Sequence, residues 1–185
     1  LRRDGRAANR RNRPACPVHP LAAVRIMSDI AERIERDEIY QSMRAYEQRS
    51  YQATGIDAIS LAARQVADTI SADAIVCYTF SGSTALRGAR ERPDAPIIAL
   101  TPRLETARRL GLTWGLHSIV TRDVTSFEEM LGKAKRMALR TGMVTGGERI
   151  VVTAGVPFGI PGSTNVLHIA WVQGDELEGY GEEPS

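Results

Sequence analysis

The chain has 185 residues, of which 43% are hydrophobic and 25% are charged, as is typical of one soluble α/β domain with an extension. No run approaches the roughly 20 uncharged apolar residues of a membrane-spanning helix, and two cysteines, Cys16 and Cys77, are too few for a disulfide framework or a four-ligand zinc site. We therefore expect a cytoplasmic protein that has no membrane partner.

Positive charge is concentrated at the start of the sequence. The formal net charge is +2, but residues 1–13 carry six arginines against one acid, Asp4, which leaves the remainder mildly acidic. One interpretation is a basic arm that contacts nucleic-acid phosphates, and the other is a disordered or artefactual tail over 1–18, which we favour. We predict no nucleic-acid partner. At the other end, residues 175–185 form an acidic tail.

The first predicted elements are helices. From Pro20 onward, apolar side chains recur at the spacing of one helix face, which predicts a helical arm within residues 19–50. A second helix is predicted after Thr54, because Thr54 and Asp57 have the spacing of a capping box and an apolar stripe follows as far as Ile70.

Short apolar runs of the kind buried in parallel sheets come next, at helix-length intervals. These predicted strands are 74–78, 96–100 and 116–121. We expect a helix that begins at Leu86 after the first strand. After the second strand we expect a helix with Thr101 as its N-cap and Pro102 at its first position, closed by Gly111 in a left-handed conformation.

The last third of the sequence completes a sheet. A capping box at 125–128 predicts a long helix that ends at Gly142, and strands are predicted at 149–153 and 165–172. Too few residues separate these two strands for a parallel crossover, so we expect an antiparallel pair. The predicted fold is α/β: a doubly wound, mostly parallel sheet of about five strands with helices on both faces, an antiparallel edge strand and an N-terminal helical arm.

A hydroxyl-rich segment between the first strand and the following helix is the first candidate site. Helix N-terminal N–H groups, a glycine and several hydroxyls at this edge of a sheet favour a bound phosphate, although Ser and Thr are also common in ordinary N-cap turns. The predicted phosphate-binding residues are Thr79, Phe80, Ser81, Gly82, Ser83 and Thr84.

The long connection between the last two strands is the second candidate. It should lie at the same sheet edge and cover the bound group, unless it is only a long surface loop. Its candidate residues are Gly155, Pro157, Gly159, Gly162, Ser163 and Thr164. No catalytic triad, Cys/His pair or carboxylate cluster with metal-ligand spacing occurs, so we predict neither a catalytic nor a metal-binding residue.

Taken together, these segments resemble the carboxy-terminal domain of pyruvate kinase in order and spacing. The segments are 79–85, 92–99, 106–110, 112–115, 155–157 and 162–165. Residues 20–27 resemble the helix that leaves the catalytic barrel of that family. The resemblance implies an α/β allosteric domain over 51–174 and an arm, 19–50, from the end of the barrel.

The resemblance also implies a function. In the family, a barrel domain transfers phosphate between phosphoenolpyruvate and ADP with Mg and K, a step of glycolysis. We expect this chain to be a truncated pyruvate kinase that is inactive alone and binds no cofactor itself. It should bind a phosphorylated effector and form a homo-oligomer through the α/β domain. Around 127–131 the Trp and Arg that hold a second phosphate are missing, which favours AMP or a sugar monophosphate over fructose 1,6-bisphosphate.

Two further expectations concern the chain as a whole. At Arg2–Ala7 the sequence departs from the family pattern, and we hypothesise that residues 1–18 are a frame-shifted or misassigned start. The alternative to a truncated enzyme is a free-standing module that senses a phosphorylated metabolite or supports assembly.

Overall fold

A computed structural model describes residues 19–40, 43, 54–157 and 163–174. The predicted tails at 1–18 and 175–185 lie outside the described residues, as does most of the second half of the arm. The chain divides into two units, Leu1–Ser50 and Tyr51–Ser185, and each is described separately.

The first unit contains helix α1, Pro20–Glu35, which begins with proline in its first turn after the N-cap residue His19. None of its residues is buried. Its apolar stripe is therefore exposed, and consists of Leu21, Val24, Met27, Ile30 and Ile34. The helical periodicity from Pro20 is confirmed over this range.

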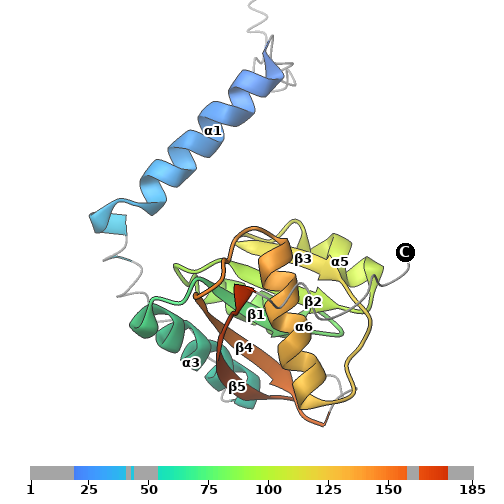
Figure 1. The fold of residues 1–185 in the computed structure, drawn as a ribbon. Helices are drawn as coiled ribbons and strands as arrows, with labels where there is room; N and C mark the ends of the chain where they lie inside the picture. The colour runs from blue at the N-terminus through green and yellow to red at the C-terminus, as the bar shows by residue number, and fades with distance from the viewer. Residues whose placement is uncertain (1–18, 41–42, 44–53, 158–162, 175–185) are drawn as a thin grey trace, which may run out of the picture. The chain divides into compact units, whose positions relative to one another are not determined.

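The second unit is built on one five-stranded sheet (Figure 1). The strands are β1 (Ala74–Tyr78), β2 (Ile97–Thr101), β3 (Leu116–Val120), β4 (Arg149–Gly155) and β5 (Thr164–Trp171), in the order β3-β2-β1-β4-β5. All neighbours are parallel except β4 and β5, whose antiparallel register pairs Val152 with His168. The predicted doubly wound sheet with an antiparallel edge is confirmed.

Helices cover both faces of this sheet. Helices α3 (Gly55–Ile70), α4 (Ser83–Arg90) and α5 (Leu104–Leu110) lie on one face, and α6 (Phe127–Arg140) lies on the other. Small side chains let α3 and α4 approach the sheet closely, because their buried apolar residues are alanines: Ala63, Ala67, Ala85 and Ala89. Larger residues, such as Met130 and Val144, fill the α6 face.

Helix starts differ from their predicted positions in two places. Helix α4 begins at Ser83 rather than Leu86, because Gly82 with φ +89° acts as the N-cap. Helix α5 begins at Leu104, and Thr101 is not its N-cap: Thr101 is the last residue of β2, and its carbonyl accepts a hydrogen bond from the Thr121 N–H (2.9 Å). Strand pairing thus overrides a local capping signal.

Two local motifs also differ. Gly111 follows α5 with φ −61°, a right-handed conformation, and the left-handed glycine is Gly115 instead. The capping box of α6 is shifted by one residue: Ser126 accepts from the Glu129 N–H (3.1 Å), and the Glu129 carboxylate accepts from the N–H of Thr125 (2.9 Å). These bonds from Thr125 lower the pKa of Glu129.

Within the described part of the chain, no helix is both long enough and apolar enough to cross a bilayer.

Candidate phosphate-binding site

The candidate site lies at the carboxyl ends of β1 and β4. Strand β1 has β2 on one side and β4 on the other, so the chain leaves β1 toward one half of the sheet and returns to the other half through β4. In doubly wound sheets this reversal of strand order opens a crevice where ligands bind. The loop after β1 and the start of the connection after β4 leave the sheet at this edge.

The first loop is a tight turn that only glycine fits. The buried Thr79 hydroxyl accepts a hydrogen bond from the Gly82 N–H (2.9 Å), which closes the turn. Gly82 has φ +89°, and an added Cβ would lie 3.2 Å from Nη2 of Arg109 and 3.3 Å from side-chain carbons of Leu110 and Thr106. Both the conformation and the space therefore require glycine.

Two serines, of which Ser81 is exposed and Ser83 is half-buried, carry hydroxyl groups on the outer side of this turn. The Oγ atoms of Ser81 and Ser83 lie 3.2 Å apart. Directly after them, the N–H groups of Thr84 and Ala85 precede the first intrahelical bond of α4, which runs from the Leu86 N–H to the Gly82 carbonyl (3.0 Å). Two hydroxyls and the positive end of α4 thus meet at one point, an arrangement that suits an anion.

The Thr84 side chain points away from this group. Its hydroxyl lies 2.7 Å from the hydroxyl of Thr164, and both residues are buried. The contact joins the start of α4 to the start of β5, so the structure brings the two predicted segments together through residues 80 positions apart. The Thr79 and Thr84 hydroxyls thus have partners within the protein, and Ser81 and Ser83 carry the more accessible hydroxyls of the loop.

The second segment is held together at its base. The Asn165 side chain accepts a hydrogen bond from the Val156 N–H (2.9 Å) and donates one to the Val156 carbonyl (2.7 Å). The Val156–Pro157 peptide is cis. At Gly155 a Cβ would collide with Ser163, so the two ends of the connection are in close contact. The predicted residues Gly159 and Gly162 lie outside the described residues.

Helix α5 supports the first loop through two residues that the sequence analysis missed. Thr106 Oγ1 donates a hydrogen bond to the carbonyl of Phe80 (3.1 Å), and the Arg109 guanidinium donates one to the carbonyl of Ser81. The Arg103 guanidinium stacks over the Phe80 ring at 4.9 Å from its centre. Thr106 and Arg109 are three positions apart, which places them on one helix face. This spacing is the only feature of the sequence that could have indicated that they contact the same loop.

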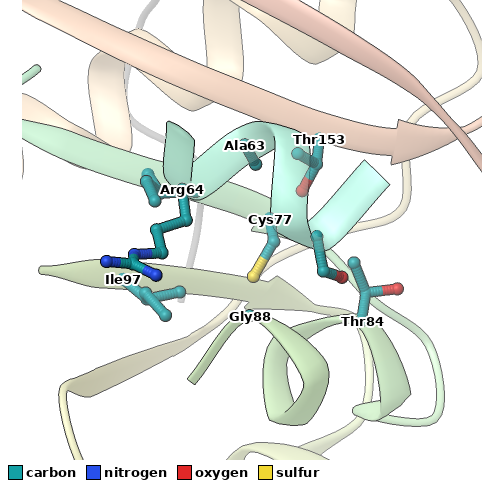
Figure 2. Close-up of a pocket in the computed structure, with 9 residues that line it drawn as sticks. Ala63, Arg64, Cys77, Thr84, Gly88, Ile97 and Thr153 are labelled. Carbon is teal, nitrogen blue, oxygen red and sulfur yellow. The ribbon is translucent and has the colours of Figure 1, made fainter. Parts of the chain in front are cut away.

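A small cavity lies behind this loop. It measures about 10 Å³, room for about one water molecule. Figure 2 shows Cys77 in its wall between Arg64 of α3 and Thr84 of α4, with Thr153 of β4 beside them. Burial raises the pKa of the Cys77 thiol to about 12, so this cysteine is protonated at neutral pH and packs as a small core residue.

A buried ion pair ties α4 to α3. The Asp57 side chain is 2% exposed, and it contacts the guanidinium of Arg87 and that of Arg90, the latter at 2.8 Å. Thr54 Oγ1 donates a further hydrogen bond to the same carboxylate (3.2 Å). The hydrogen bond from Arg87 lowers the pKa of Asp57 against the opposing effect of burial. The helix that begins at the candidate site is thus anchored at its far end.

Acidic and metal-binding side chains do not gather elsewhere in the described ranges: no three His, Cys, Asp or Glu residues there lie close enough together to hold a metal ion.

Comparison with known proteins identifies the family. Residues 57–170 match the family model described as the alpha/beta domain of pyruvate kinase. The chain is 45% identical over 159 residues to the pyruvate kinase of Methylorubrum extorquens and 39% identical over 155 residues to that of Agrobacterium vitis, alignments that cover 86% and 84% of this chain. The pyruvate kinase of Staphylococcus haemolyticus is 35% identical over 163 residues, which cover 88% of this chain.

The alignments cover 33%, 33% and 28% of these three relatives, so the chain spans about a third of the length of the curated proteins it matches. With the five-stranded sheet and the predicted motifs in order along it, the chain belongs to the pyruvate kinase family and contains its alpha/beta domain.

Proposed function

We propose that this chain is the effector-binding part of a pyruvate kinase and that it holds the phosphate of a phosphorylated metabolite at the start of α4. One observation carries the proposal. The Ser81 and Ser83 hydroxyls, 3.2 Å apart, lie beside the α4 N-terminus at the point where the sheet order reverses. Hydroxyl and backbone N–H donors together satisfy several oxygens of one phosphate, and the helix dipole favours its negative charge.

The connection after β4 covers the bound metabolite in this proposal. Val156 at its start is fixed by two hydrogen bonds to Asn165, the second residue of β5. Thr164, at its end, is bonded to Thr84 in the first turn of α4. In this proposal, a phosphate bound at the start of α4 therefore also affects the base of this connection, through the hydrogen bond between Thr84 and Thr164.

The effector is a monophosphate, AMP or a sugar phosphate, rather than fructose 1,6-bisphosphate. The resemblance places a second phosphate near the start of the long helix. There α6 carries Glu128 and Glu129 in its first turn, and two carboxylates repel a phosphate.

The phosphoryl transfer from phosphoenolpyruvate to ADP, with Mg and K, belongs in this proposal to the part of the relatives that the chain does not match. This chain contributes regulation and assembly into a homo-oligomer in the cytoplasm. Purified chain should form no pyruvate from phosphoenolpyruvate and ADP; pyruvate formation that survives removal of host kinase would contradict this part.

Thermal unfolding of the full chain tests the phosphate site. We expect millimolar AMP, ribose 5-phosphate or glucose 6-phosphate to raise the unfolding temperature, since a ligand at 100 times its Kd adds about 2.7 kcal/mol. The shift should vanish in the Ser81→Ala/Ser83→Ala double variant and persist in Ser28→Ala, which changes an exposed serine of α1. The proposal is wrong if the ligands raise the unfolding temperature equally in the wild type, the double variant and Ser28→Ala, or if none of the compounds raises it.

A free-standing sensing module is the second candidate, and the self-contained core favours it. Both buried clusters of the second unit are formed by residues between Ala63 and Val172. Such a core needs no barrel to be complete. Genomic context separates the two: a barrel-encoding frame directly upstream supports the truncated enzyme, and an intact pyruvate kinase gene elsewhere supports the module.

A further inference from the structure

The candidate phosphate site contains no charged side chain of its own. From Thr79 to Leu86 the sequence has neither lysine nor arginine, so the loop offers only hydroxyls and backbone N–H groups. A cationic donor binds phosphate more strongly than a neutral one, because the attraction between opposite charges adds to the hydrogen bond. A cation that reaches the loop from another element would therefore change its affinity substantially.

Arg109 of α5 is in that position. Its guanidinium donates to the carbonyl of Ser81, and Nη2 lies 3.2 Å from the place where Gly82 would carry a Cβ. The group therefore lies against the loop backbone at Ser81 and Gly82. A guanidinium has five N–H donors in a planar fork, so a single bond to Ser81 leaves donors for an anion.

The other arginines near the loop have different surroundings. Arg103 stacks on the Phe80 ring, and Arg87 is held by the buried carboxylate of Asp57. Arg108 is exposed like Arg109 and is adjacent to it on α5, whereas the hydrogen bonds described from α5 to the loop come from Thr106 and Arg109. Arg108 is thus a matched control for a cation on the same helix.

The Arg109 bond also sets the direction of the loop carbonyls. Together with the Thr106 hydroxyl, it turns two successive carbonyl oxygens, those of Phe80 and Ser81, toward α5. Carbonyl oxygens repel an anion, and satisfying them on the α5 side leaves the hydroxyls and N–H groups for the phosphate. The same residue therefore orients the loop and brings positive charge to it.

We infer that Arg109 is a specificity-determining residue of this site: it supplies the positive charge that selects a dianionic phosphate monoester, and it positions the loop through the Ser81 carbonyl. The inference rests on the proposed function. It reaches further, because it assigns the charge of the site to a helix outside the hydroxyl-rich segment.

Calorimetric titration of the full chain with ribose 5-phosphate tests the inference. We expect Arg109→Gln to weaken binding by about tenfold, the loss typical of a hydrogen bond to a charged group, and Arg109→Lys to lose less because it keeps the charge. Arg108→Gln should change the Kd less than about twofold. The wild-type affinity should also fall more steeply with NaCl than that of Arg109→Gln, a difference that a purely structural role does not produce.

The outcomes separate this inference from the proposed function. If Ser81→Ala/Ser83→Ala abolishes binding while Arg109→Gln and Arg108→Gln bind equally well, the inference is wrong and the proposed function stands. If the wild-type chain does not bind ribose 5-phosphate, AMP or inorganic phosphate, both are wrong. Circular dichroism checks that each variant is folded. If Arg109→Gln does not fold, the affinity and the salt dependence of Arg109→Lys are compared with those of Arg108→Gln instead.

Discussion

At the scale of single residues, the candidate site depends on a glycine. Gly82 has a positive φ and lies against Thr106, Arg109 and Leu110, so any side chain there strains the turn and pushes on α5. Because Gly82 also precedes the first residue of α4, the same strain moves the helix start on which the proposed phosphate binding relies.

Gly82→Ala should therefore lower the free energy of unfolding by about 1–2 kcal/mol and weaken phosphate binding. Denaturant unfolding and calorimetric titration measure the two effects. Gly55→Ala is the control: Gly55 opens α3, and a Cβ added there would have no neighbouring atom within 4 Å, so its substitution should be neutral or slightly stabilising. Equal stability of the two variants would contradict the requirement for glycine at 82.

The residue scale also shows where local patterns suffice. Thr79, Gly82 and the serines between strand and helix are neighbours in sequence, so their turn chemistry was predictable. Thr106 and Arg109 reach the same loop from 26 and 28 positions away, and only the folded sheet brings them there. A long-range contact of this kind leaves no local signature in one sequence.

At the scale of elements, the ion pair between α3 and α4 is the main polar contact behind the site. Asp57 is 2% exposed, whereas Arg87 and Arg90 are 26% and 38% exposed. Removing the Asp57 carboxylate takes away the charge that neutralises two partly buried guanidinium groups. In buried ion pairs, the loss of one partner lowers the free energy of unfolding strongly.

Asp57→Asn should destabilise the domain by about 2–3 kcal/mol, somewhat less than for a fully buried pair because both arginines keep some water. Asp68→Asn is the control, since Asp68 forms a partly exposed pair with Arg64 and should change stability by less than about 1 kcal/mol. Denaturant unfolding at neutral pH compares them; equal losses would contradict a special role for Asp57.

The same pair predicts a pH dependence. Arg87 lowers the pKa of Asp57 below its ordinary value of 3.8, so the folded state binds this proton less readily than the unfolded state. The contribution of this ion pair to the free energy of unfolding is therefore complete above the ordinary pKa of Asp57, and it is lost as the pH falls through the lowered pKa of the folded state. The difference in stability between the wild type and Asp57→Asn should shrink below about pH 4. A difference that grew at low pH would contradict the prediction.

Element boundaries show where sequence patterns fail. The apolar run at 74–78 predicts β1 correctly, because a strand buried on both faces leaves a continuous apolar segment. Thr101 and Pro102 read locally as a helix start, but β3 pairs with β2 through Thr101 and delays α5. Helix α4 starts early because a left-handed glycine caps it, a signal weaker than Ser or Thr.

At the scale of the whole molecule, the topology makes one site out of two segments. The strand order places β1 beside β4, so Thr84 and Thr164 meet although three helices and three strands, from α4 to β4, lie along the chain between them. The alternation of apolar runs and capping signals predicted this order of elements. It did not predict the Thr84–Thr164 contact, which depends on which side chains of adjacent strands and helices face each other.

The central claim is that the start of α4 binds the phosphate of a metabolite that the connection after β4 covers, and amide chemical-shift mapping of the ¹⁵N-labelled full chain with ribose 5-phosphate tests it most directly. The account predicts that the largest shifts fall on the amides of 81–85 and 163–165, with α1 and β3 unchanged. Saturable shifts centred on any other part of the chain, or no shifts at millimolar ligand, would contradict it.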